Sequence, residues 1–303
     1  NALSVMNWSY LSTIQSGNGL GNVADASLVQ TSNGAIRVYF KNGNDPMSNM
    51  TGFDNLIHSA VSNDAGLTWS IESGVRIPIG SPVEVLPKSG GGYQAWGWNI
   101  GVVGDPMYYA ESSDGLNFVQ VSIAGLDKNK CLTSAGISFG PLGDPSIVLL
   151  ADGSWLLHAQ GVGVGNTGPT FARWACVATS PDGKTWSPVQ SRSYGGSTDV
   201  STNPTIYKNN SGKIEWWWPT SLGSAVRIGD GTTFGDTVLT VQGGDPERLD
   251  LADGTEMLTL GGFDNRAGGA LIFLKRATSP YTITKVQSMP EPGYSTPNAK
   301  LTW

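Results

Sequence analysis

Acidic residues recur where short apolar runs of this chain begin, which predicts one site assembled from distant segments. Asp25, Asp144 and Asp245 each precede an apolar run, and Glu84 and Glu247 stand in similar surroundings. Two carboxyl groups held close together can serve as general acid and base, or as nucleophile, in the hydrolysis of a glycosidic bond. The alternative is structural, because an Asp at the start of a strand can simply cap a turn.

The apolar runs come in pairs joined by short turns, which is the pattern of β-hairpins. Clear turns stand at Asn33-Gly34, Asp152-Gly153 and Asp253-Gly254, and such pairs are strong hairpin signals. Units of this kind start near residues 25, 83, 144, 203 and 245. Because each unit supplies four strands in succession, the repeat predicts an all-β fold, a five-bladed β-propeller of four-stranded antiparallel blades.

The whole chain, residues 1–303, is expected to form a single domain, because no linker divides it. Either the strand-like run Trp8–Ile14 or the tail Glu291–Trp303 can complete the last blade and close the ring. A sixth blade built from the two termini is the main alternative. A β-sandwich is less favoured because it does not explain the regular outer turns.

Those outer turns carry a second repeated motif, Ser-x-Asp-x-Gly-x-Thr-Trp, which is known as the Asp-box. It is complete at Ser62–Trp69 and shortened at Ser112–Phe118, Ser180–Trp186 and Gly229–Phe234. We expect a tight turn in which the Asp accepts hydrogen bonds from amides, the Gly supplies a positive φ and the Trp packs underneath. Such turns indicate a fold and not an activity.

Composition excludes several classes of function. The chain has 41 Gly, 17 Pro and 11 Trp with 14 % charged residues, which favours β structure over helix. A net charge of −6 offers no attraction to nucleic acid, and no apolar run approaches the roughly 20 residues that span a bilayer. The start at Asn1, the low charge and the many aromatic residues suit a secreted, monomeric protein that handles carbohydrate.

The residues that could bind a metal or form a disulfide are few. Cys131 and Cys176 allow one disulfide, and two free buried thiols fit the sequence equally well. His58 and His158 are too few and too dispersed for a zinc site. We expect no cofactor and no required metal, with a structural Ca²⁺ on the axial carboxylates as an option.

The blade openings resemble those of the five-bladed glycoside hydrolases of families 43 and 62, and family 43 most closely. The segment Gly143–Val148 matches the family's third-blade opening, Ala24–Val29 matches its first, and Asn203–Lys208 matches the segment after its fourth-blade acid. The resemblance implies a secreted hydrolase of poly- or oligosaccharides, by analogy arabinose- or xylose-containing ones. It also implies that Asp25 is the general base and that Asp144 orients the acid and tunes its pKa.

One departure from the family pattern is informative. Where the family has its acidic Glu, this chain has Thr202, whose hydroxyl cannot protonate a leaving group. The acid must then be Asp199, Glu247 or Asp245, or be absent. We favour Asp199 because it lies closest in sequence to the vacant position.

A further set of residues is expected to contact substrate, because they are acidic, amide-bearing, basic or aromatic groups at blade openings or on second strands. These are Glu84, Trp96, Trp98, Asn203, Trp217, Asp245, Glu247 and Arg248. For the tryptophans the competing interpretation is packing between blades.

Two other functions also fit the sequence. A propeller that binds a glycan without cleaving it, either a lectin or an inactive relative of the hydrolases, fits the missing Glu. A sialidase is less favoured, because its first inner strand would need an Arg where this chain has Asp25.

Overall fold

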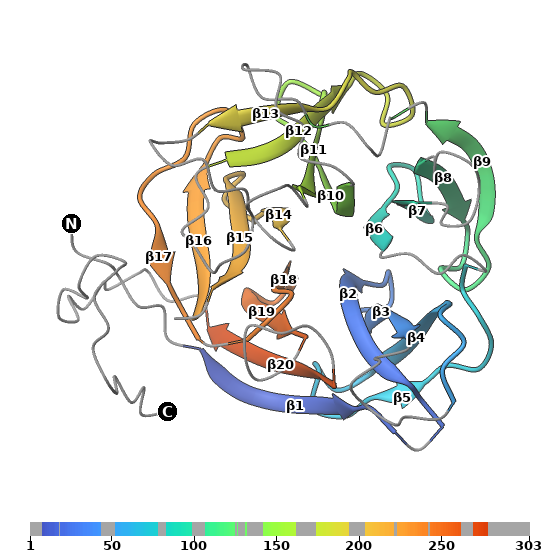
Figure 1. Cartoon of the computed structure of the whole chain (residues 1–303). Coiled ribbons are helices and arrows are strands. Elements are labelled where there is room, and N and C mark those ends of the chain that lie inside the picture. Colours follow the sequence, from blue (N-terminus) through green and yellow to red (C-terminus); the bar gives the residue numbers. More distant parts are fainter. Residues whose placement is uncertain are drawn as a thin grey trace, which may run out of the picture.

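Five four-stranded antiparallel sheets surround a central axis, so the chain is a five-bladed β-propeller as predicted, and the six-bladed alternative is wrong (Figure 1). The computed structural model describes residues 8–17, 19–43, 52–77, 83–98, 107–124, 126, 131, 142–161, 174–193, 204–220, 223–241, 243–261 and 269–277. None of these residues is helical, and the described part of the chain has no helix that could span a membrane.

The first three blades follow the chain from the innermost strand outward. The first comprises β2 (Asn22–Gln30), β3 (Ile36–Gly43), β4 (Ile57–Ser62) and β5 (Ser70–Ile71). The second comprises β6 (Val83–Pro87), β7 (Tyr93–Trp98), β8 (Met107–Ser112) and β9 (Val119–Ala124). The third comprises β10 (Leu142–Leu149), β11 (Trp155–Gly161), β12 (Trp174–Ser180) and β13 (Gln190–Ser193).

The ring closes through a strand from the start of the chain. The fourth blade comprises β14 (Thr205–Lys208), β15 (Ile214–Thr220), β16 (Gly223–Gly229) and β17 (Val238–Leu239). The fifth comprises β18 (Glu247–Asp250), β19 (Thr255–Leu260), β20 (Ala270–Ala277) and, outermost, β1 (Ser9–Gln15). Of the two segments expected to close the ring, the one near Trp8 does so, whereas residues 281–286 and 291–303 lie outside the described residues.

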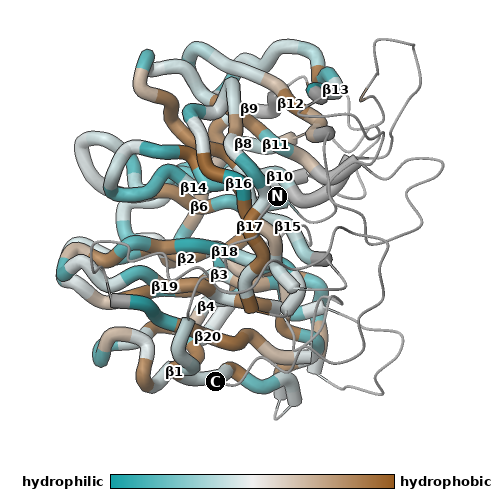
Figure 2. The backbone as a smooth tube through the Cα atoms, turned by 90° about the vertical axis from the view of Figure 1, so that its left-hand side faces the viewer, coloured by the Kyte–Doolittle hydropathy of each residue, from teal (hydrophilic) through white to brown (hydrophobic). Residues whose placement is uncertain are grey.

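The core lies between neighbouring blades. In one such layer Val38 and Phe40 of β3 pack with Leu271 and Phe273 of β20. Figure 2 shows hydrophobic segments running through the strands, β17 and β20 among them, and hydrophilic segments at the turns on its left-hand side. Both faces of a blade are therefore buried, and the polar turns mark the ends of the strands.

The outer turns join each blade to its neighbour. In the first, the Asp64 carboxylate accepts hydrogen bonds from the Thr68 amide at 2.9 Å and the Ser62 hydroxyl at 2.8 Å, while Gly66 has a φ of 89°. The Trp69 ring stacks on Phe273 of the fifth blade, with centroids 4.2 Å apart. These contacts between blades make the turns part of the ring.

Turn carbonyls accept hydrogen bonds from the preceding blade in the same way. The Tyr39 hydroxyl donates to the Gly115 carbonyl at 2.7 Å, and the Trp96 indole donates to the Gly183 carbonyl at 2.7 Å. Blade order is thereby fixed by specific hydrogen bonds as well as by apolar packing.

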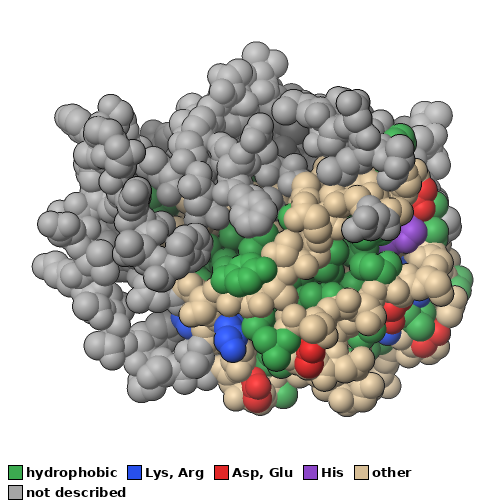
Figure 3. Space-filling view, turned by 90° about the horizontal axis from the view of Figure 1, so that it is seen from below, with side chains coloured by type: hydrophobic (Ala, Val, Ile, Leu, Met, Phe, Trp, Pro, Cys, Tyr) green, Lys and Arg blue, Asp and Glu red, His purple; other side chains and the backbone are tan. Residues whose placement is uncertain are grey.

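The outer strands β1 and β5 lie next to each other on the rim. Their face is shown in Figure 3, where hydrophobic side chains gather among uncharged polar surface. Tyr10, Leu67 and Ile71 are 59 %, 57 % and 46 % exposed there. The charged side chains visible on the described part of this face are scattered.

A disulfide joins Cys131, which lies between β9 and β10, to Cys176 of β12, with Cα atoms 5.8 Å apart. Of the two states that the sequence left open, the structure therefore contains the bridged one. The bridge ties the connection between the second and third blades to the third sheet. Both cysteines are fully buried.

Two glycines of the β6–β7 turn should respond differently to replacement by alanine. Gly90 and Gly92 have similar positive φ values of 88° and 79°. A Cβ atom at Gly90 would meet open space, whereas one at Gly92 would lie 2.6 Å from the Ser112 carbonyl oxygen. We expect Gly90→Ala to cost about 1 kcal/mol of unfolding free energy and Gly92→Ala about 1–3 kcal/mol more, because backbone must shift. Urea unfolding of both variants measures the difference, and equal losses would contradict this prediction.

Candidate axial carboxylate site

Two inner strands begin with the same backbone irregularity, and each holds an aspartate there. In the β2–β3 pair Ala24 lies opposite Lys41 and Ser27 opposite Tyr39, which leaves one extra residue on β2. In the β10–β11 pair the same extra residue lies between Gly143 and Ser146. Such a β-bulge re-aims the side chains beside it. The backbone thus gives Asp25 and Asp144 equivalent positions at the openings of the first and third blades.

Asp25 and Asp245 share a backbone conformation that non-glycine residues rarely adopt. Their φ angles are 54° and 40°. A left-handed conformation in a side-chain-bearing residue costs free energy and persists where the surrounding structure imposes it, often at functional sites. The two aspartates come from the first and the fifth blade, which are neighbours in the closed ring (Figure 1).

A hydrogen bond joins the side chains of Asp25 and Asp245. Because two ionised carboxylates cannot donate to each other, such a pair shares one proton. Burial raises the pKa of Asp25, while the positive charge of Lys41 and the hydrogen bond with Asp245 act in the opposite direction. The pair lies at a cavity of ≈ 40 Å³ on the axis, enough for a water molecule, whose walls include Asp25, Val83, Glu84, Ser146, Asp245 and Glu247.

A second level of polar side chains connects the inner strands around the axis. The Ser27 hydroxyl accepts a hydrogen bond from the Val85 amide at 2.9 Å, and the Ser146 hydroxyl accepts one from the Ile206 amide at 3.0 Å. The Glu84 carboxyl accepts a hydrogen bond from the Ile147 amide at 3.2 Å. The first, second and third blades thus each accept a hydrogen bond from a backbone amide of the next blade along the chain.

The same pattern continues to the closing blade. Glu247 of β18 accepts hydrogen bonds from the Leu28 amide and from the Thr205 side chain. Glu247 therefore occupies in the fifth blade the position that Ser27 occupies in the first. These side chains form a ring around the axis. Glu84 and Glu247 contribute carboxyl groups to it, and Ser27, Ser146 and Thr205 contribute hydroxyls.

Burial dominates the ionisation of both glutamates. Burial raises the pKa of Glu84 to about 7, against hydrogen bonds from Ser146, Ile147 and Ser27. The pKa of Glu247 is raised well above its usual range by burial and by the negative charge of Glu84. One proton or more is therefore held at this level at neutral pH.

This ring predicts a pH-dependent stability. Because the folded chain binds a proton at Glu84 between its ordinary pKa of 4.5 and about 7, unfolding free energy should fall as pH rises through that window, by about 3 kcal/mol. Glu84→Gln should remove the share of this dependence that Glu84 contributes, while Glu247 and Asp25, whose pKa values burial also raises, keep theirs. Urea unfolding at pH 5, 6, 7 and 8 measures it, with Glu111→Gln at the surface as control. Equal slopes for wild type and Glu84→Gln would contradict the prediction.

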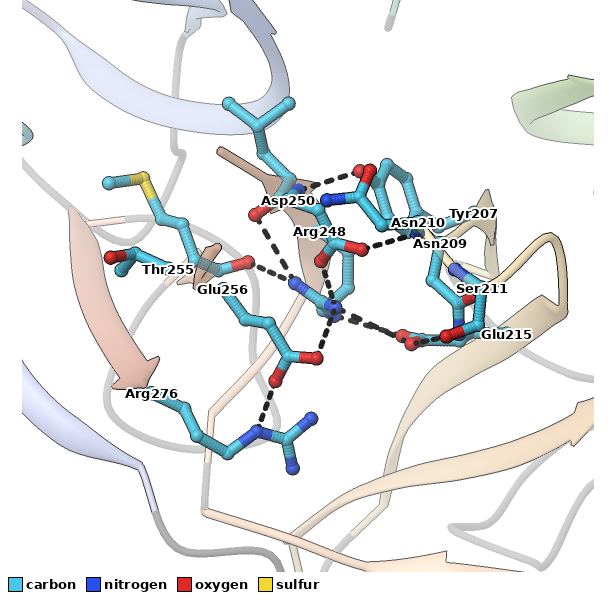
Figure 4. Close-up of polar contacts among 12 residues, drawn as sticks. Tyr207, Asn209, Asn210, Ser211, Glu215, Arg248, Asp250, Thr255, Glu256 and Arg276 are labelled. Atoms are coloured by element: carbon cyan, nitrogen blue, oxygen red, sulfur yellow. Dashed lines mark hydrogen bonds and ion pairs between the residues drawn. The ribbon is translucent and has the colours of Figure 1, made fainter. Parts of the chain in front are cut away.

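The structure corrects the expectation that Arg248 contacts substrate. Its side chain is fully buried between the fourth and fifth blades (Figure 4). The guanidinium donates to Glu215 at 2.9 Å, to Asp250 at 2.7 Å and to the Met257 carbonyl at 2.7 Å. All of these partners are structural, so Arg248 holds two blades together and does not face the axial cavity.

Two of the predicted sugar-contacting tryptophans are also buried. Trp96 and Trp217 are 0 % exposed. Trp96 packs against Tyr109 and Trp155 between the second and third blades, and the Trp217 indole donates to Glu215 at 2.8 Å. The competing interpretation, packing between blades, holds for both, because alternation along β7 and β15 points them into the layers between sheets.

Several predicted site residues are not described, so their roles stay predictions. Asp199, Thr202 and Asn203 lie outside the described residues. Asp144 and Trp98 lie within strands, but their side chains are not described. Glu84, Asp245 and Glu247 line the axial cavity, where a contact to substrate was expected.

Sequence reasoning missed four residues of this region. Ser27, Ser146 and Thr205 stand at the second level of the axis, and Lys41 acts on Asp25 from the neighbouring strand. The signals were weak: a hydroxyl two residues after Asp25 and after Asp144, and a Lys that pairing across the Asn33-Gly34 turn brings beside β2. The described residues hold no group of three or more His, Cys, Asp or Glu side chains suited to a metal ion.

Comparison with known proteins gives the fold. No family model matches the sequence, and no curated protein matches it either. Among solved structures, a family 117 glycoside hydrolase of the marine bacterium Zobellia galactanivorans is similar, with 15 % identity, a TM-score of 0.60 and 90 % of each chain covered. The chain shares the fold of propeller glycoside hydrolases.

Two further similar structures are an arabinanase and a β-xylosidase/α-arabinofuranosidase. The α-L-arabinanase of Penicillium chrysogenum, complexed with arabinobiose, has 13 % identity and a TM-score of 0.51, with 90 % of this chain and 99 % of that one covered. A family 43 β-xylosidase/α-arabinofuranosidase from a compost metagenome, complexed with xylotriose, has 12 % identity and a TM-score of 0.53, covering 88 % and 99 %. At such identities the likeness shows the fold alone.

Proposed function

We propose that this protein is a secreted glycoside hydrolase whose reaction takes place above the axial cavity. The observation that carries the proposal is the proton-sharing pair of Asp25 and Asp245, held on left-handed backbone at that cavity. A carboxyl pair in a partly buried funnel, in a fold shared with glycoside hydrolases, supports general acid–base chemistry on a glycosidic bond.

Asp25 fits the role of general base. It is half-buried at the cavity, next to the positive charge of Lys41. The ionised carboxylate would take a proton from a water molecule in the cavity while that water forms the new bond to the anomeric carbon. The bond between that carbon and the leaving-group oxygen breaks, and an acid protonates this oxygen.

Asp245 fits a supporting role better than that of the acid. Carboxyl groups that act from opposite sides of a sugar lie roughly 5 Å or more apart, whereas Asp245 is in hydrogen-bond contact with Asp25. The Glu247 carboxyl already accepts hydrogen bonds from the Leu28 amide and the Thr205 side chain. Asp199 is therefore our proposed acid, and Asp144, at the bulge equivalent to that of Asp25, its electrostatic neighbour.

The proposed substrate is a glycan that contains arabinose or xylose. Two similar structures hold arabinobiose and xylotriose, which supports this class for the present chain. Secretion is supported by the disulfide between Cys131 and Cys176, since structural disulfides belong to oxidising compartments.

The test is a screen against aryl α-L-arabinofuranosides, aryl β-D-xylosides, arabinan and xylan, with reducing-sugar release as the readout. Cleavage of a member of this set by wild type, lost in Asp25→Asn, is the expected result. A folded wild-type protein that cleaves none of a wide glycan panel would overturn the proposal.

Glycan binding without cleavage is the second candidate, and one observation favours it. A groove of ≈ 520 Å³ lies between the first and second blades, lined by polar groups that include Thr31, Asn33, Asn63 and Lys88. Hydroxyl and amide groups of this kind suit hydrogen bonds to sugars. Calorimetric binding of an oligosaccharide that is equal in wild type and Asp25→Asn, with no cleavage, would select this function.

A further inference from the structure

The proton shared by Asp25 and Asp245 has to be held more by one carboxyl than by the other. The two environments differ in exposure. Asp245 is 7 % exposed, its Oδ2 atom is fully buried, and Gly261 packs so closely that a Cβ there would lie 3.1 Å from the Asp245 Cβ. Asp25 is half-buried. Since a buried carboxyl loses more solvation on ionisation, burial favours the proton on Asp245.

The positive charge of Lys41 on β3 also favours the state in which Asp245 holds the proton. Strand pairing sets Lys41 opposite Ala24, at the edge of the bulge that aims Asp25. Its ammonium interacts electrostatically with the Asp25 carboxyl. Among the described residues, the other ionisable groups that line this cavity are Glu84 and Glu247, which are both buried acids, so neither offers a competing positive charge.

We propose that Lys41 is a positioning residue that fixes the direction of proton sharing, so that Asp25 carries the negative charge and Asp245 the proton. This inference rests on the proposed function for its catalytic meaning, because a base must be ionised to accept a proton from water. Asp245 then donates a hydrogen bond that orients Asp25. The distribution of charge within the pair is a property of the folded chain whether or not it cleaves a glycan.

A spectroscopic test is independent of activity. Protein labelled with ¹³C at aspartate Cγ is titrated from pH 3 to 8, and the Asp25 and Asp245 signals are assigned with the two Asp→Asn variants. We expect Asp25 to titrate at lower pH than Asp245 in wild type. In Lys41→Met the Asp25 signal should titrate at higher pH, and Lys41→Arg should restore the wild-type behaviour.

Matched variants keep the test decisive. Lys208→Met removes the same charge at an exposed position at the far end of β14 and should leave both signals unchanged. If Lys41→Met does not fold, Lys41→Gln takes its place. An Asp25 titration that is the same in wild type and in the folded Lys41 variants would overturn the proposal, as would a wild-type order in which Asp245 ionises first.

Kinetics separate this inference from the proposed function. On a cleaved substrate, Lys41→Met should lower kcat about 3- to 10-fold on the acidic limb of the pH profile and leave KM and the plateau within about twofold. If the ¹³C signals respond as expected but no substrate is cleaved, the proposed hydrolase function fails and the role of Lys41 in the pair stands. If a substrate is cleaved but the ¹³C signals do not respond, the hydrolase function stands and the proposed role of Lys41 fails.

Discussion

Replacing Asp25 by asparagine is expected to lower kcat by about 10²- to 10⁴-fold, with KM changed much less. The range is that of a general acid–base group removed from a reaction. An amide cannot accept a proton from water, but it can still hydrogen-bond with Asp245, so the backbone at the bulge should persist. Activity of wild type should fall as pH decreases, because a base with a pKa raised by burial becomes protonated there.

Two further variants sharpen this measurement. Asp245→Asn keeps a hydrogen-bond donor to Asp25, so we expect a loss of only about tenfold and an altered acidic limb. Asp152→Asn, in the exposed β10–β11 turn, should leave kcat unchanged. Full activity of a folded Asp25→Asn protein would exclude Asp25 as the base.

Replacing Arg248 by methionine is expected to lower the free energy of unfolding by about 3–5 kcal/mol, the cost of breaking a buried ion pair by removal of one partner. Glu215 and Asp250 keep only 1 % and 4 % of their side-chain surface exposed, so their charges would stay buried without the guanidinium. Figure 4 shows these carboxylates, Glu256 included, converging on Arg248. Urea unfolding with a linear extrapolation measures the loss.

Arg276 provides the matched control. It pairs with Glu256 at the outer end of the same cluster and is 13 % exposed. We expect Arg276→Met to cost only about 1 kcal/mol, because the buried Glu256 carboxylate keeps a second cation, the Arg248 guanidinium, 3.9 Å away. Adding Glu215→Gln to Arg248→Met should recover part of the loss. Equal small losses for both arginine variants would show that the cluster contributes little to blade closure.

The repeat and its turns could be predicted because they depend on local chemistry. An Asn-Gly pair such as that at Asn33 favours one hairpin geometry, and the Asp64 turn satisfies its own amides within seven residues. Five such units imply a ring, since each blade exposes two apolar faces that need a partner. The choice of β1 as the closing strand depended on the whole ring, because two segments of similar character competed for it.

The site was predicted only in part, for a reason particular to propellers. Alternation along β15 separates Trp217 from its neighbours, but both faces of a blade are buried against other blades, so the pattern cannot tell packing from substrate contact. The same ambiguity hid the role of Arg248. The bulge that orients Asp25 also has no signal in the sequence, since it is defined only by the pairing of β2 with β3.

By itself, then, the sequence determined the architecture, the number of units and the segments from which the axial carboxylates come. The tertiary structure alone decided that Asp25 meets Asp245, that Glu84 and Glu247 lie a level below them, and that Lys41 lies beside the pair. These relations join the first, second and fifth blades across the axis. Such distances in space are set by closure of the ring, and no local preference of the chain encodes them.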